Sequence, residues 1–242
     1  MTAPESLIAR TFVELADTTE PSFELAAFLR VLADRCAELL GAEAAGVVVT
    51  DGDVTAVEGS TDAVRELARL DLEGEQGPAA DSRSSGGTVR CDDLGRAAES
   101  WPDFAVATRE AGFSAVFVIP MRQRDEIIGA VTLFSAGAIA TDEAGLGEAL
   151  VRVAASGIVH QRTRRRQKTL VDQLQVALTS RIAIEQAKGV LAERLGVPVG
   201  QAFQALRSYA RSHNRKLVEI AEAVVAGNPE GDAVVAAFRA AL

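Results

Sequence analysis

The chain has 242 residues, 48% of them hydrophobic and 24% charged, a composition typical of a folded soluble protein and not of a disordered one. Its formal net charge of −9 is divided unevenly. Residues 1–159 hold 12 Arg, no Lys and 27 Asp or Glu, whereas residues 160–227 hold 12 Lys or Arg against 5 Asp or Glu. An acidic region is therefore followed by a basic one, where a polyanion would bind.

Several classes of protein and site are excluded by the same sequence. No apolar run approaches the ~18 residues of a membrane helix, and the N-terminus lacks a signal-peptide pattern, so we expect a cytoplasmic protein. Cys36 and Cys91 are too few for a disulfide framework or a zinc site and are interpreted as reduced structural thiols. The sequence has no P-loop, GxSxG or HExxH motif and no His/Cys cluster. We therefore expect no metal, no cofactor and no enzymatic activity.

The acidic region alternates between helical and strand patterns. Two amphipathic helices are expected first, over residues 5–17 and 21–40. Strands marked by β-branched and aromatic runs are predicted over 45–50 and 54–58 around the hairpin dipeptide Asp51-Gly52, then over 88–91, 113–120 and 127–134. Between them we expect a helix over 61–70, a loop over 74–87 because of its Gly, Ser and Pro, and a helix or loop containing Trp101-Pro102. These patterns predict an antiparallel sheet flanked by helices.

One long helix, or two nearly continuous ones, is predicted from about Asp142 to Leu195. Thr141 is its expected N-cap, with Asp142 and Glu143 in the favourable first turn. The length exceeds that of ordinary globular helices, which favours a coiled coil between two copies of the chain and hence a homodimer. The basic run over 162–168 interrupts the apolar pattern and is interpreted as a solvated helix face at the domain junction.

Beyond Gly196 and Pro198 the basic region predicts two more short helices, the first closed by Asn214. The three apolar faces converge in a compact three-helix unit. Its outward faces carry cations suited to phosphate contacts, namely Arg181, Lys188, Arg207, Arg211, Arg215 and Lys216. Gly189 is unfavourable within a helix, and its small size lets another backbone approach. A packed helix and a nucleic acid are equally good explanations for it.

The basic region contains three separated motifs, IEQAKGVL at 184–191, AFQALRSYA at 202–210 and LVEIA at 217–221. In this order they resemble the ANTAR domain, the RNA-binding module of transcription antiterminators. The resemblance covers residues 170–225 and implies recognition of paired RNA hairpins with short loops, which prevents a terminator from forming. Matched position by position, it assigns Ala187, Lys188 and Gly189 on the first helix, and Arg207 and Ala210 on the second, to RNA binding. The entry to the second helix, VPVGQ, departs from the Ser- or Asp-capped pattern usual in the family.

The acidic region contains EQGPAAD at 75–81, WPDFA at 101–105, and GFSAVFVIPM and IIGAVTLF within 112–134. By these motifs residues 20–160 resemble a GAF domain, a module found ahead of ANTAR in many bacterial regulators. Ala79 stands where such regulators often have Cys, so a thiol sensor is not expected there. Two alternatives remain open for Trp101, Phe104, Phe117 and Phe134: they line a pocket for a small apolar or aromatic ligand, or they only fill the core.

Together these patterns predict an α+β chain with a GAF-like sensor and dimerisation domain over 1–160, an ANTAR-like three-helix RNA-binding domain over 161–227, and a C-terminal tail over 228–242. The resemblance implies a signal-transducing transcription antiterminator that binds RNA hairpins under control of a small-molecule or protein signal. A DNA-binding three-helix regulator is the alternative, because small basic helices suit that role as well.

Overall fold

The computed structural model describes residues 3–18, 23–52, 54–74, 76–139 and 144–240. The chain divides into two compact units, Met1–Arg164 and Arg165–Leu242. The predicted long helix is confirmed as α6, Ala144–Leu195, which contributes residues to both units. The proposed N-cap Thr141, with Asp142 and Glu143, lies outside the described residues.

Within the described residues, the N-terminal unit has one antiparallel sheet of five strands, in the order β2-β1-β5-β4-β3. The strands are β1 Ala44–Asp51, β2 Val54–Gly59, β3 Val89–Cys91, β4 Ala115–Gln123 and β5 Glu126–Ser135. They coincide with the β-branched and aromatic runs of the sequence, so the predicted sheet is confirmed. At the turn after β1, Gly52 has a φ of +62°, a left-handed conformation that glycine adopts without steric cost.

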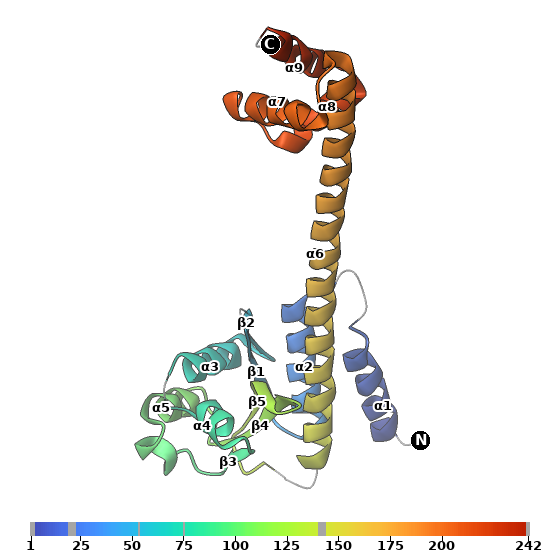
Figure 1. Ribbon diagram of the computed structural model, residues 1–242. Coiled ribbons are helices and arrows are strands. Elements are labelled where there is room, and N and C mark those ends of the chain that lie inside the picture. The colour runs from blue at the N-terminus through green and yellow to red at the C-terminus, as the bar shows by residue number, and fades with distance from the viewer. Residues whose placement is uncertain (1–2, 19–22, 53, 75, 140–143, 241–242) are drawn as a thin grey trace. The chain divides into compact units, whose positions relative to one another are not determined.

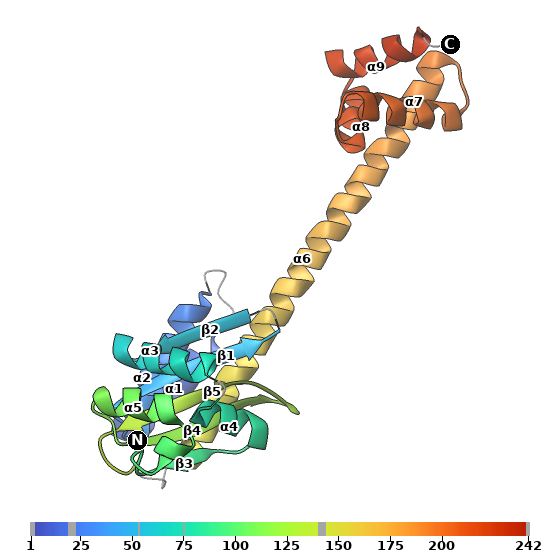
Figure 2. The same cartoon turned by 90° about the vertical axis from the view of Figure 1, so that its left-hand side faces the viewer.

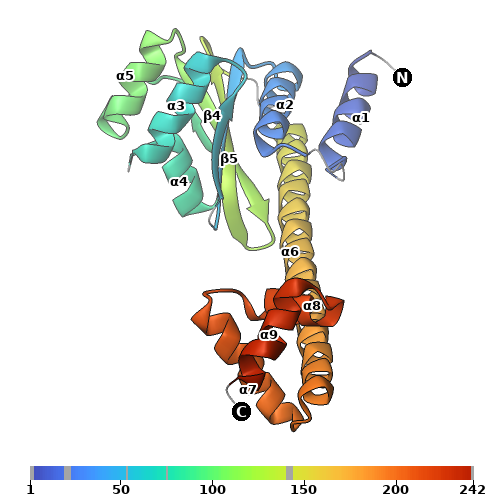
Figure 3. The ribbon, with the colours of Figure 1, turned by 90° about the horizontal axis from the view of Figure 1, so that it is seen from above.

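Helices cover both faces of this sheet (Figures 1 and 3). On one face lie α2 (Leu25–Leu39) and the first turns of α6, and α1 (Ala3–Ala16) packs outside them against α2. On the other face lie α3 (Asp62–Glu73), α4 (Pro78–Ser85) and α5 (Pro102–Glu110), which follows the short 3-10 helix η1 (Ala97–Glu99). Each face has its own apolar core. Leu32, Val131 and Leu150 are fully or almost fully buried in the first, and Val64 and Phe134 in the second.

The loop predicted over 74–87 is wrong in part, because α4 forms within it. Pro78 occupies the start of the helix, where its missing N–H costs nothing. The Asp71 carboxylate, at the end of α3, accepts hydrogen bonds from the Ala79 N–H at 3.0 and 3.3 Å and so satisfies a free amide at the N-terminus of α4. At the other end, Gly86 caps the helix with a φ of +72°. Short polar residues thus become helical through a cap supplied by another helix.

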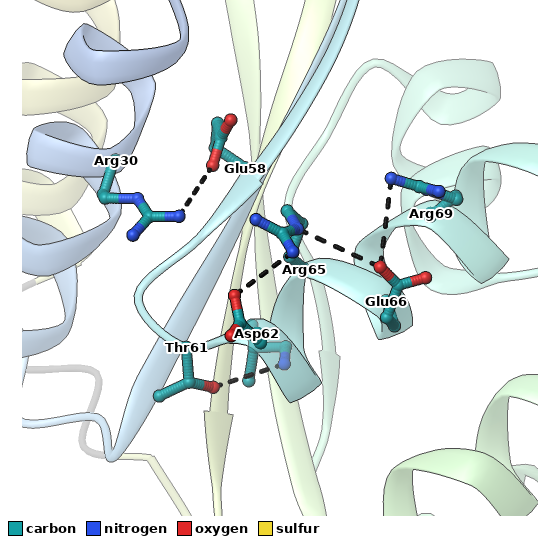
Figure 4. Close-up of polar contacts among 8 residues, drawn as sticks. Arg30, Glu58, Thr61, Asp62, Arg65, Glu66 and Arg69 are labelled. Carbon is teal, nitrogen blue, oxygen red and sulfur yellow. Dashed lines mark hydrogen bonds and ion pairs between the residues drawn. The ribbon is translucent and has the colours of Figure 1, made fainter.

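Polar contacts fix the turn between β2 and α3 (Figure 4). The Thr61 hydroxyl accepts a hydrogen bond from the Val64 N–H at 3.3 Å and caps α3. Arg65 forms an ion pair with Asp62 at 3.2 Å, and Arg30 of α2 reaches Glu58 of β2 at 3.5 Å. Exposed pairs of this kind contribute little free energy each, so the cap is the main contribution to the local structure.

The C-terminal unit gathers α7 (Val199–Ser212), α8 (Leu217–Ala226) and α9 (Pro229–Arg239) around the last turns of α6 (Figure 2). Leu191, Leu206 and Ile220 are fully buried in one apolar core, which confirms the predicted three-helix arrangement. Residues 228–242 were expected to be a tail, but α9 buries Val234 and Val235 in the same core. The Asn228 side chain accepts a hydrogen bond from the Gly231 N–H at 2.9 Å and caps this additional helix.

Candidate nucleic-acid interface and ligand cavities

One face of α7 carries two exposed cations. Gln204, Arg207 and Arg211 are exposed at helical spacing, while Ala205 and Leu206 on the other side of the helix are buried. Among the described residues, neither Arg207 nor Arg211 forms an ion pair within 4.0 Å. Both guanidinium groups therefore present free donors to the solvent, and these donors match the oxygens of a phosphate.

Lys188 of α6 lies beside this face in a different environment. Its Nζ lies 2.7 and 2.8 Å from the two carboxylate oxygens of Glu185 and 5.5 Å from the centroid of the Phe203 ring, one turn before Arg207. Its side chain is 18% exposed. Lys188 is thus held by an acidic and an aromatic neighbour and must exchange the Glu185 contact for a phosphate if it binds RNA. Phe203 was not predicted as a site residue, although its spacing from Arg207 was visible in the sequence.

Gly189 and its small neighbour Ala187 lie on opposite sides of α6. A Cβ built on Gly189 would have open space around it, with no atom of the described structure within 4 Å, so no helix packs against it within the chain. Ala187 is fully buried, as is almost all of Ala210. These two alanines pack the core and have no side-chain surface for RNA. Gly189 is left as an open backbone position close to Lys188.

The remaining predicted cations are dispersed. The Arg215 Nε donates to Glu219 at 3.0 Å and its Nη1 to Glu230 at 2.7 Å, and the Glu219 contact raises the pKa of the guanidinium. This arginine therefore ties α8 to α9. Arg181 and Lys216 are exposed, and Lys216 stands at the N-cap of α8. Arg207 and Arg211 are exposed one turn apart on α7, and Lys188 contacts Phe203 of the same helix.

The predicted aromatic pocket is not formed by its four residues. Phe117 belongs to the core on the α2 face of the sheet, whereas Trp101, Phe104 and Phe134 pack together on the opposite face. In the register of β4 and β5, Val116 is opposite Phe134 and Phe117 opposite Leu133, so the pleat turns Phe117 away. Phe104 and Phe134 are almost completely buried, with ring centroids 6.3 Å apart. The three aromatic rings fill the core, as the second alternative proposed.

A small cavity lies next to this aromatic cluster, between the end of α3 and the start of α5. It has a volume of about 210 Å³, and Leu70, Gln76, Pro102 and Phe104 are among its lining residues. Nearby, the Trp101 Nε1 donates a hydrogen bond to the Asp81 carboxylate at 2.9 Å and links the start of α5 to α4. The cavity is smaller than the ~300 Å³ of most small-molecule sites.

The two cysteines are free thiols in different environments. Cys36 is fully buried in the core, and desolvation raises the pKa of its thiol to about 12, so it stays protonated. Cys91 is partly buried at the end of β3. Across the described residues no three His, Cys, Asp or Glu side chains are grouped to hold a metal ion. None of the helices in the described part of the chain is long and apolar enough to cross a bilayer.

Comparisons with known proteins agree with this architecture. The GAF domain family matches residues 24–159 and the ANTAR domain family residues 172–225. Among solved structures, the GAF domain of a phosphoenolpyruvate-protein phosphotransferase from Coxiella burnetii has 16% identity and a TM-score of 0.53, over 67% of this chain and 96% of that one. A bacteriophytochrome from R. palustris has 10% identity and a TM-score of 0.51, over 84% of this chain and 45% of that one.

At such identities the two likenesses show the fold alone. A search of curated protein sequences gave no match. The family matches cover the sheet with its helices and, separately, the basic helical unit. The chain therefore belongs to the GAF domain family and carries an ANTAR domain after its GAF domain.

Proposed function

We propose that the chain is a transcription antiterminator whose ANTAR domain binds paired hairpins in nascent RNA under control of its GAF domain. The observation that carries this proposal is the pair of exposed arginines on α7, Arg207 and Arg211, next to Lys188 within the ANTAR match. Neither arginine is ion-paired with another described residue. Arginine binds phosphates in a bidentate manner and stacks on unpaired bases, which are the groups that a hairpin loop offers.

We further propose that two copies of the chain associate through α6. Val171, Leu174, Leu178 and Ile182 recur every three or four residues on one side of this helix. Each is about half exposed or more, from 49% to 61%. A stripe of this kind is costly to leave in water and is complementary to itself across a two-fold axis. A dimer would carry two ANTAR domains, so that one RNA with two hairpins is held at both sites with a gain in effective concentration.

The test is a binding measurement by fluorescence anisotropy with the full chain. We expect an RNA with two hairpins to bind more tightly than the same RNA with one hairpin unpaired, and more tightly than duplex DNA of equal length. Affinity should fall as salt rises, because phosphate contacts release counterions. Tighter binding of the DNA would favour the helix-turn-helix alternative and contradict the proposal.

Substitutions locate the site in the same assay. Arg207→Ala should weaken RNA binding about tenfold, the size expected for one lost charge-assisted hydrogen bond. Lys188→Ala should weaken it less, because Lys188 is already paired with Glu185 in the free protein. Arg109→Ala is the matched control, since Arg109 is an exposed arginine on α5 of the GAF domain. If all three variants bind RNA as tightly as wild type, the RNA-binding site is elsewhere.

A further inference from the structure

A second, larger cavity lies at the edge of the GAF sheet, away from the aromatic core. β3 pairs with β4 only from Val116 to Val118, so the edge of β4 beyond Val118 is left to other groups. There the loop after α4, the next residues of β4 and the first turns of α6 enclose a volume of about 330 Å³. This volume is within the range of small-molecule sites, about 300–1,000 Å³.

The lining of this cavity brings two arginines and one glutamate together from one strand and one helix. Arg122 comes from β4, and Glu148 and Arg152 lie one turn apart on α6. Arg122 is held in place because its Nη1 donates a hydrogen bond to the Gly86 carbonyl at 2.9 Å, which leaves its other donors available. Within the described residues Arg152 has no carboxylate within 4.0 Å, unlike Arg30, Arg65 and Arg90, which are ion-paired.

This set of side chains defines the chemistry of a ligand. Two guanidinium groups suit a carboxylate, and Glu148 can accept a hydrogen bond from an ammonium or hydroxyl group on the same molecule. The lining has a formal charge of +1, which one carboxylate neutralises and a phosphate dianion would exceed. Ile119 and Pro120 provide an apolar wall for a short aliphatic group. We propose that this cavity binds a small organic acid with a donor beside its carboxylate, an α-amino or α-hydroxy acid.

The position of the cavity suggests how such an acid would act as the signal. Arg122 and Gly86 belong to the sheet and its loop, whereas Glu148 and Arg152 belong to α6, the helix that continues to Leu195 within the ANTAR domain. A bound acid would therefore join the start of α6 to the edge of the sheet. This inference names the class of signal for the proposed regulator. Acid binding is measured without RNA, so its failure and the failure of RNA binding are separate results.

The experiment measures thermal shift and calorimetric binding with the full chain. The probes are the standard L-amino acids, L-lactate and glycerate, with propionate as the matched acid that has no donor and inorganic phosphate as the competing anion. We expect at least one amino or hydroxy acid to bind and to raise the melting temperature, and propionate to bind at least tenfold more weakly than that acid. If no amino or hydroxy acid binds, or if phosphate binds more tightly than all of them, the proposal is wrong.

Variants assign the binding to the cavity. Arg152→Gln should lower the affinity for the acid at least tenfold. It should leave the melting temperature of the free protein unchanged, because the Arg152 side chain is exposed and has no ion-pair partner among the described residues. Arg109→Gln, an exposed arginine on α5 outside the cavity, should bind like wild type. Glu148→Gln should lower the affinity for an amino acid, because Glu148 is proposed to accept a hydrogen bond from its ammonium group. Undiminished binding by Arg152→Gln would overturn the assignment, even where the acid binds the wild-type protein.

Discussion

Gly189 is a residue at which one substitution should change stability and RNA binding in opposite directions. It lies within α6, where glycine is less favourable than alanine by about 0.5–1 kcal/mol, and a Cβ there meets no atom within 4 Å. We expect Gly189→Ala to raise the free energy of unfolding of the ANTAR domain by roughly that amount. The same methyl group should weaken RNA binding by blocking close approach of the RNA backbone.

Thermal unfolding and anisotropy measured on one preparation test both halves of this prediction. Ala192→Gly, in the same helix and partly buried, should lower the stability and serves as a control for the helix effect. A stabilised Gly189→Ala protein that binds RNA like wild type would show that the open position has no part in recognition.

Asp71 gives the GAF domain a pH-dependent stability. Asp71 is 2% exposed, and desolvation raises the pKa of its carboxyl from the ordinary 3.8 to about 7. The Ala79 N–H and Arg83 act to lower this pKa, and Asp81 acts to raise it further. The folded state therefore holds this proton more tightly than the unfolded state. The free energy of unfolding should fall as the pH rises from 3.8 to about 7.

Asp71→Asn removes the titration and keeps an oxygen that accepts from the Ala79 N–H. Urea unfolding at about pH 5 and about pH 8 measures the free energy of unfolding of both proteins. From the lower to the higher pH, that free energy should fall by roughly 2–4 kcal/mol more in wild type than in the variant. Equal pH dependence in the two proteins would mean that the carboxyl is not the group responsible.

At the scale of elements, α9 extends the folding unit beyond the ANTAR match, which ends at residue 225. Val234 is 1% and Val235 is 8% exposed, and a Cβ on Gly231 would collide with the Ala223 carbonyl of α8, so the two helices are in close contact. A chain that stops after Gly227 should lose roughly 3 kcal/mol of stability or more, given about 1.5–3 kcal/mol for each buried valine.

Urea unfolding of this truncated chain, next to a chain that stops after Arg239, measures the contribution of α9. The longer chain keeps all of α9 and should unfold like the full chain. If the two truncated chains are equally stable, the packing of α9 adds nothing to the ANTAR core.

The sequence predicted elements that depend on local pattern and missed those that depend on distant partners. Strands β4 and β5 were correctly predicted because β-branched and aromatic residues mark them directly. Helix α4 was missed because its N-terminal amide is capped by Asp71 from another helix. Phe117 was placed in the wrong cluster because the face of a strand residue depends on its register with the neighbouring strand.

The same distinction holds for the candidate site. The exposed positions of Arg207 and Arg211 followed from the apolar stripe on the other side of α7. The burial of Ala187 and Ala210 did not, because small residues suit both a packed core and a close contact with RNA. The pairing of Lys188 with Glu185 also depends on rotamers that spacing alone does not determine.

At the scale of the whole molecule, the proposed association through α6 has a direct test with a built-in control. Replacing Leu174 and Leu178 with Glu should convert a dimer into a monomer in sedimentation velocity, because it places charges on the shared apolar stripe. Val176→Glu should leave the dimer intact, since Val176 is 67% exposed but lies on the other side of the helix.

RNA binding connects this result with function. The monomeric variant should lose its preference for two hairpins over one while each ANTAR domain still binds a single hairpin. A wild-type chain that sediments as a monomer at all concentrations would contradict the proposed arrangement.

The uneven distribution of basic residues has a consequence for chemical probing. The sequence has three lysines, Lys168, Lys188 and Lys216, and all lie in the C-terminal unit. An amine-acylating reagent therefore modifies lysine side chains in the C-terminal unit, because the GAF domain has none. Lys168 and Lys216 are exposed, whereas Lys188 is held against Glu185 and Phe203, so Lys188 should be acylated last. The rate of acylation at Lys188 thus reports how often its contact with Glu185 opens.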